Sequence, residues 1–277
     1  MEVSFTRIAH ILAMLAGIAL LAGCASSADT KIAASTEPPD LIYNQADALL
    51  GRGKFRDAAA RFEVVDRDHP YSPYARRSIV MGAFAHYKAK QYPEAIQAAK
   101  RYTTLHPGTK ETALAYHIIA SSEFDQISDA ERDQTRTRKA LAALETLVRR
   151  YPKSRYAVQA SNRIKLAHDV LAASEMKVGR YYLKQHNYLA AVNRFRVVIT
   201  DFQTTVHVEE ALMRVAEAYM ALGIKGEAQT AAAVLGHNFP DSKWYQHAYT
   251  LLQSDGLEPR EDTGSWISRS IRKITPG

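Results

Sequence analysis

One spacing recurs five times along this chain, and it constrains the fold more than any other feature. An alanine is followed four residues later by a second apolar residue, and eight residues after that by a position where a helix should end. The five copies are Ala58/Phe62/Pro70, Ala95/Ala99/Pro107, Ala140/Leu144/Pro152, Ala191/Phe195/Gln203 and Ala228/Ala232/Pro240. Alanine lets two helices approach closely, and proline ends a helix. The spacing therefore predicts five consecutive helical hairpins.

The repeated unit is similar to the tetratricopeptide hairpin, which has about 34 residues. The spacings between the helix-ending positions are 37, 45, 51 and 37 residues, so the middle of the array is irregular. Charges of both signs in residues 125–138 predict a solvated loop, and helical periodicity without proline over 156–179 predicts one long or doubled helix. The predicted fold is all-α, a right-handed superhelical array of five tetratricopeptide-like hairpins with an elongated central helix.

The amino terminus has the pattern of an export signal over residues 1–23. Arg7 precedes an apolar run that ends in Leu21-Ala22-Gly23-Cys24, which resembles the bacterial lipoprotein box, and Cys24 is the only cysteine of the chain. We expect a covalent lipid on Cys24 and a tether over 24–39. Because the two residues directly after Cys24 are Ala25 and Ser26 and neither is aspartate, we expect the periplasmic face of the outer membrane. A plain secretory signal with an incidental cysteine is the alternative.

The remaining chain divides into three predicted parts. Residues 40–110 hold repeats one and two, 111–253 hold repeats three to five, and 254–277 form a basic amphipathic tail. The tail has four open interpretations: it packs back on the last repeat, covers a partner, lies on lipid headgroups, or is disordered.

Composition and motifs favour binding over catalysis. Lys and Arg number 36 against 29 Asp and Glu, but the basic residues are dispersed and the export signal separates the chain from nucleic acid. No hydrolase, metalloprotease or nucleotide-loop motif is present, and the ten histidines lack metal-ligand spacing. We therefore predict no enzyme, no catalytic or metal residues, and no cofactor beyond the lipid. A carboxylate pair assembled by folding is the alternative.

Helical arrays bind partners along the face lined by the first helix of each hairpin. Tyr43 in repeat one, and Phe84 and Tyr87 in repeat two, fall on this face and make it aromatic. They are candidate binding residues. The alternative is that some of them are core residues displaced by one position in the helical register.

Three short sequence motifs carry a family resemblance: Tyr71-Ser72-Pro73-Tyr74, the run from Tyr151 to Tyr156 that reads Tyr-Pro-Lys-Ser-Arg-Tyr, and Ala191-Val192-Asn193-Arg194. Together with the lipoprotein box and the repeats, they resemble the BamD/ComL family of lipoproteins from the outer-membrane β-barrel assembly (BAM) machinery. The resemblance runs from Cys24 to about Leu252. The sequence departs from the family's pattern in two places: Gln203 stands at a usual proline, and the tail is basic.

The resemblance implies a non-enzymatic adaptor. Its C-terminal repeats would hold a BamA-like scaffold protein, with Arg194 at the position of the family's scaffold-contacting arginine. Its N-terminal repeats would receive unfolded β-barrel outer-membrane proteins through a C-terminal aromatic signal, at Tyr43, Phe84 and Tyr87. Other BAM lipoproteins are further candidate partners. The competing function is a periplasmic tetratricopeptide lipoprotein that serves peptidoglycan, division or pilus assembly.

Overall fold

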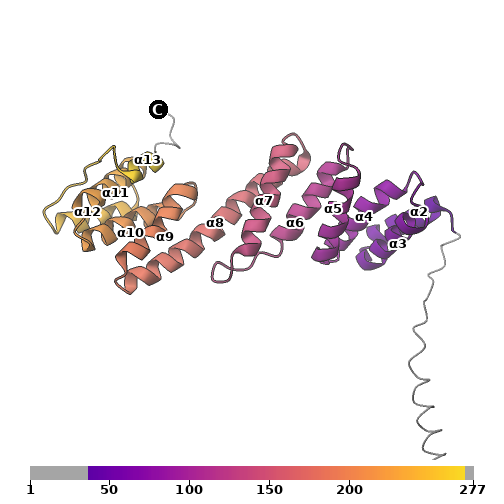
Figure 1. The fold of residues 1–277 in the computed structure, drawn as a ribbon, viewed down its shortest axis with the longest axis horizontal. Helices are drawn as coiled ribbons and strands as arrows, with labels where there is room; N and C mark the ends of the chain where they lie inside the picture. Colours follow the sequence, from indigo (N-terminus) through magenta and orange to yellow (C-terminus); the bar gives the residue numbers. More distant parts are fainter. Residues whose placement is uncertain (1–36, 272–277) are drawn as a thin grey trace, which may run out of the picture. The chain divides into compact units, whose positions relative to one another are not determined.

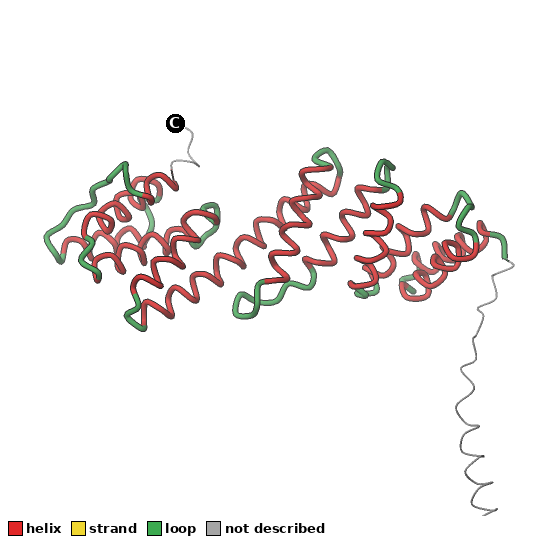
Figure 2. Tube along the Cα trace, viewed as in Figure 1, coloured by secondary structure: helices red, strands yellow, loops and turns green. Residues whose placement is uncertain are grey.

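The computed structural model describes residues 37–271. The predicted signal peptide, Cys24 and most of the predicted tether lie outside the described residues, as do residues 272–277. Between residues 37 and 271 the chain forms helices, turns and loops and contains no strand (Figure 2). The prediction of an all-α fold is confirmed.

Ten of the helices between residues 37 and 271 form five hairpins (Figure 1). The pairs are α2 (Pro39–Gly51) with α3 (Phe55–Asp68), α4 (Ala75–Lys88) with α5 (Tyr92–Leu105), α6 (Thr112–Phe124) with α7 (Thr135–Arg150), α8 (Arg155–Lys184) with α9 (Tyr188–Asp201), and α10 (Val208–Ala221) with α11 (Lys225–Asn238). Two shorter helices follow, α12 (Lys243–Gln253) and α13 (Trp266–Ile271).

The recurring alanines sit where the helices pack most closely. Ala58, Ala95, Ala140, Ala191 and Ala228 are all 0% exposed. Each helix from α2 to α11 packs on the next one, and the first helices α2, α4, α6 and α8 also contact one another in sequence. The central α8 is a single helix of 30 residues that packs on α7 and on α9. The prediction of an elongated central helix is confirmed, and of its two forms, one long or a doubled helix, the structure has the single long helix.

Four of the five hairpins turn through the same backbone conformation. Gly53, Lys90, His186 and Gly223 have φ values of 75°, 60°, 58° and 74°. In each turn this residue's N–H donates to the carbonyl three residues earlier, and the next N–H donates to the carbonyl five residues earlier. This is the Schellman arrangement that closes a helix carboxyl end. Gly53 is thus a turn residue, and its positive φ explains the glycine at this position of the first hairpin.

The third hairpin has a longer connection, residues 125–134, between the end of α6 at Phe124 and the start of α7 at Thr135. The predicted solvated loop over 125–138 is therefore too long. The side chain of Gln134 is buried and donates from Nε2 to the carbonyls of Asp129 at 3.0 Å and Arg132 at 2.7 Å. Its Oε1 accepts from Thr137 at 2.8 Å. These bonds hold the end of the loop against the first turn of α7.

Aromatic rings fill the space beside the small residues. The ring of Phe195 is fully buried and lies over Gly179, where a Cβ would come within 2.4 Å of Cε1. Only glycine allows α8 and α9 to pack at this distance. This contact explains the pairing of a glycine with an aromatic residue in the fourth repeat.

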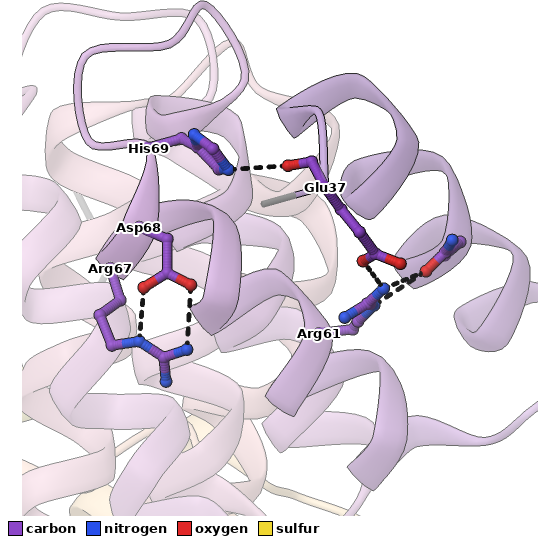
Figure 3. Close-up of polar contacts among 6 residues, drawn as sticks. Glu37, Arg61, Arg67, Asp68 and His69 are labelled. Carbon is purple, nitrogen blue, oxygen red and sulfur yellow. Dashed lines mark hydrogen bonds and ion pairs between the residues drawn. The ribbon is translucent and has the colours of Figure 1, made fainter. Parts of the chain in front are cut away.

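The first hairpin is tied to the residues that precede it (Figure 3). Arg61 of α3 forms an ion pair with Glu37 and donates from Nε to Gln45 of α2 at 2.9 Å. His69 donates from Nε2 to the backbone carbonyl of Glu37 at 3.0 Å. The chain therefore enters α2 in a direction set by α3.

The described part of the tail packs back on the last repeats. Helix α13 contacts α9 and α11, and its residues Ile267 and Ile271 are 0% and 7% exposed. Of the four interpretations of the tail, packing on the array holds for residues 266–271. Arg272 and Lys273 lie outside the described residues.

Candidate binding site

Tyr43 belongs to the core of the first hairpin. It is 6% exposed, and its ring lies 5.4 Å from the rings of both Phe62 and Tyr74. Its ring is therefore not displayed on the surface with those of Phe84 and Tyr87. A contact between Tyr43 and a partner would require the ring to leave this packing.

Phe84 and Tyr87 lie together on α4, with ring centroids 6.5 Å apart. The ring of Tyr92 lies 6.3 Å from that of Tyr87 on the other side. Phe84 and Tyr87 are half-buried, so part of each ring is accessible. They form the aromatic part of the candidate site.

A series of polar contacts leads from Tyr87 of α4, through Asp125 at the end of α6, to Arg163 of α8. The Tyr87 hydroxyl donates to Asp125 at 2.8 Å, and Asp125 pairs with Arg163 of α8 at 3.3 Å. Burial raises the pKa of Tyr87, and the bond to Asp125 raises it further, while Arg163 opposes both effects. The hydroxyl therefore stays protonated and donates to the carboxylate.

Arg163 adds a positive charge to this region, and one nitrogen of its guanidinium lacks a hydrogen-bond partner among the described residues. Its guanidinium carbon lies 4.7 Å from the ring centroid of Phe124, and its Nη1 is buried with no hydrogen-bond partner among residues 37–271. A buried N–H of a charged group without a partner is costly, so it favours an added acceptor such as a carboxylate. We name the set of Phe84, Tyr87, Asp125 and Arg163 the aromatic–arginine site.

His117 contributes no charge to this site at neutral pH. Burial lowers its pKa to about 4, and the nearby cations of Arg163 and Arg155 lower it as well. Its ring stacks on Tyr156 with centroids 4.5 Å apart and an interplanar angle of 15°. The positive charge available to a ligand here is therefore that of Arg163.

The sequence did not single out Asp125, Arg163 or His117. Asp125 is one of many charges in a stretch predicted to be solvated, and Arg163 is one of several basic residues along α8. Only folding brings α4, the end of α6 and α8 together. The aromatic pair on α4 was the signal that located this part of the surface.

Arg194 lies on α9, far in sequence from the aromatic–arginine site. Its Nη1 pairs with Glu175 of α8 at 3.2 Å, and 44% of its side chain is exposed. Arg196, two residues on, stacks instead over the ring of Trp266 at 4.8 Å. Of these two neighbours, Arg194 is thus the one whose charge is bound only by a single exposed ion pair.

Two further properties bear on function. No group of three or more His, Cys, Asp or Glu side chains that could hold a metal ion occurs in residues 37–271. In the same range, none of the helices combines the length and the hydropathy needed to cross a bilayer. The predicted lipid on Cys24 falls outside the described residues.

Tandem helical hairpins with accessible binding surfaces define a class of repeat scaffolds for protein partners. A family model named YfiO, described as "Outer membrane lipoprotein", matches residues 35–235. The chain belongs to this family of outer-membrane lipoproteins.

Curated relatives agree with this assignment. The chain is 45% identical over 242 residues to the outer membrane protein assembly factor BamD of Caulobacter vibrioides, with 87% of this chain and 79% of the relative covered. It is 38% identical to BamD of Rickettsia prowazekii, covering 90% and 98%. It is 31% identical to BamD of Neisseria meningitidis serogroup A, covering 86% and 94%. The resemblance inferred from the sequence is confirmed.

Proposed function

We propose that this protein is a non-enzymatic adaptor for the assembly of β-barrel proteins into the outer membrane. The observation that carries the proposal is the similarity to outer membrane protein assembly factors over nearly the whole folded array, at 45% identity to one of them. Hairpin arrays act by binding, and the surface offers two separate places for partners.

The adaptor is held at the periplasmic face of the outer membrane by a lipid on Cys24. Support comes from the lipoprotein box at Leu21-Ala22-Gly23-Cys24 and from the name of the family. Two or more acyl chains, each contributing about 0.8 kcal/mol per buried CH₂, make such an anchor stable.

Unfolded β-barrel clients bind at the aromatic–arginine site through a C-terminal aromatic residue. Such a residue offers a ring and a carboxylate next to each other. The ring packs edge to face on Phe84 and Tyr87, and the carboxylate accepts from the unused Nη1 of Arg163. Tyr43 packs on Tyr74 at the start of α4, whereas Phe84 and Tyr87 lie toward the other end of that helix, so we assign the client ring to Phe84 and Tyr87 and not to Tyr43.

A peptide with a C-terminal phenylalanine tests this site. Its affinity for the protein should fall by about tenfold when the peptide carboxylate is amidated or when Arg163 is replaced in Arg163→Gln, since one charge-assisted bond contributes about 1.5 kcal/mol or more. Arg155→Gln, which removes an equal charge from the same helix, is the matched control and should change little. If the amidated peptide binds as well as the acid, Arg163 does not read the carboxylate.

The second place is Arg194, which we propose contacts a carboxylate of a BamA-like scaffold. The guanidinium is exposed and held by one partner, so it can exchange Glu175 for a second carboxylate at little cost. Arginine can take that carboxylate with two parallel bonds, which lysine cannot reproduce. Further lipoproteins of the complex are candidate partners for the remaining faces.

Co-purification with the scaffold tests Arg194. Arg194→Glu should keep the fold but lose the scaffold, because breaking an interfacial charge pair from one side costs about 2–5 kcal/mol. Arg180→Glu is the matched control, since Arg180 also pairs with one glutamate, at 3.0 Å, and its side chain is 43% exposed. A charge reversal on the scaffold should restore binding to Arg194→Glu. Equal recovery of the scaffold with both variants would contradict the assignment.

A further inference from the structure

Two parts of the array are internal copies of one another. The three helices α3 to α5 correspond throughout to the three helices α9 to α11 at an offset of 133 residues, as Ala58 with Ala191, Phe62 with Phe195 and Ala95 with Ala228 show. In each copy, two second helices of hairpins flank a first helix between them, and both pack on it. We name the groove over α4 between α3 and α5 the N-terminal groove, and its copy over α10 between α9 and α11 the C-terminal groove.

The C-terminal groove is filled by the chain's own tail. Trp266 donates from Nε1 to the hydroxyl of Tyr219 at 3.0 Å, and Arg196 lies over the Trp266 ring at 4.8 Å. Ser265 donates to Glu227 at 2.6 Å, and the hydroxyl of Thr230 accepts from the backbone N–H of Asp262 at 3.1 Å. One residue from α9, one from α10 and two from α11 thus hold the segment 260–271.

The same four positions in the N-terminal groove line an open cavity. The counterparts of the four contact residues, 133 positions earlier, are Glu63, His86, Glu94 and Gln97, and all four line a cavity of about 230 Å³. The residues that hold the tail in one copy therefore surround an empty space in the other. The tail segment 260–271 is therefore the guide to what the cavity can hold.

The floor of the cavity is built of smaller or more polar residues than its copy. Gly82 stands where the C-terminal groove has Val215, and Ser78 stands where it has Ala211. Ser78 is 1% exposed, and its hydroxyl has no hydrogen-bond partner among the described residues. A buried hydroxyl without a partner favours a ligand that supplies one.

The rim of the N-terminal groove is acidic. Glu63, with a side chain 62% exposed, occupies the position of Arg196 and accepts from His86 at 2.8 Å. Glu94 is exposed and forms no ion pair with any residue of 37–271. Asp66 is paired with Arg101, which leaves the two glutamates as the available charges. An occupant of this groove should therefore be basic.

We propose that the N-terminal groove binds a short amphipathic helix of a partner protein, in the manner in which the C-terminal groove holds α13. The helix inserts one aromatic side chain into the cavity over Gly82 and directs basic side chains toward Glu63 and Glu94. This site lies over α4 between α3 and α5, and none of the residues that line its cavity belongs to the aromatic–arginine site.

The next groove along the array supplies an internal control. Residues of α5, α6 and α7 line a hollow in which Lys100 stands at the position of Glu63, and Tyr116 and Ile119 stand at those of Ile79 and Gly82. Its rim charge is opposite and its floor residues are larger. A basic helix should avoid it.

The test uses the full mature chain and a fluorescently labelled peptide with the sequence of residues 265–273, which carries the tryptophan and three basic residues. The chain's own α13 occupies the C-terminal groove, so the peptide reports on the N-terminal one. We expect saturable binding with a Kd on the order of micromolar. The Kd should rise about tenfold or more when the peptide's tryptophan becomes alanine, or when its basic residues become glutamate.

Three protein variants locate the binding. Ala98→Leu, which fills the cavity, and Glu94→Lys, which reverses the rim charge, should each weaken binding about tenfold. Ala143→Leu places the same side chain at the equivalent position of the neighbouring groove and should leave the Kd unchanged. Absence of saturable binding, equal binding of the glutamate peptide, or equal weakening by Ala98→Leu and Ala143→Leu would overturn the proposal.

Discussion

The first two hairpins and the last two pack their helices in the same way, but the N-terminal groove is open and the C-terminal groove is covered. Phe62 and Phe195 fill the same position with no exposure, and the turns at Gly53 and His186 follow the same path. The last two hairpins then cover their groove with the chain's own α13, and the first two leave theirs open.

The comparison shows where the sequence has room to vary. Buried positions at the helix contacts keep the same residue in both copies, as Ala58 with Ala191, Phe62 with Phe195 and Val65 with Val198 show, because the helices must pack at the same distance. The rim positions are free to differ, and they do: Arg196 and Tyr219 suit a tryptophan of the tail, whereas Glu63 and His86 do not copy them. The difference separates a groove used for stability from one available for a partner.

The largest expected effect comes from breaking the covered groove. Trp266→Ala should lower the free energy of unfolding by about 3 kcal/mol, because it removes a large ring, its bond to Tyr219 and its contact with Arg196. Urea unfolding followed by circular dichroism measures this change.

The matched change in the open groove is Ala98→Leu, which adds an apolar side chain to an empty cavity and should not destabilise the protein. If Trp266→Ala were neutral and Ala98→Leu costly, the roles of the two grooves would be the reverse of those described here.

A smaller effect should distinguish the α6–α8 region from the C-terminal hairpins by pH. The pKa of His117 is about 4 in the folded protein, because of burial and the nearby cations of Arg163 and Arg155. It is about 6.5 in the unfolded chain, which therefore takes up the proton first. The stability from neutral His117 is complete above pH 6.5 and is lost as the pH falls from 6.5 to 4. We expect a loss of about 2 kcal/mol over this window.

Unfolding at pH 7 and at pH 4.5 measures the loss, and His117→Phe should reduce it while keeping a ring stacked on Tyr156. Hydrogen exchange should show the acid effect in α6 and α8 before α10 and α11. An unchanged pH slope in His117→Phe would assign the loss to other groups.

The spacing of alanines and prolines was enough to predict the hairpins, because the small residues at helix contacts recur at the same spacing in each repeat. It could not place Tyr43, because a shift of one position in a helix moves a side chain by about 100°. Lys90 and His186 gave no turn signal, because residues other than glycine rarely adopt positive φ. The Tyr87–Asp125–Arg163 chain joins residues up to 76 positions apart and is formed only by folding.

The central claim is that the two grooves occupy equivalent positions in the array and differ in occupancy, and the number of peptide sites tests it most directly. Isothermal titration of the full chain with the peptide of residues 265–273 should give one site. In the variant Trp266→Ala/Ile267→Ser, which frees the C-terminal groove, the same titration should give two, and adding Ala98→Leu should return the number to one. A stoichiometry that is the same in all three proteins would contradict the claim.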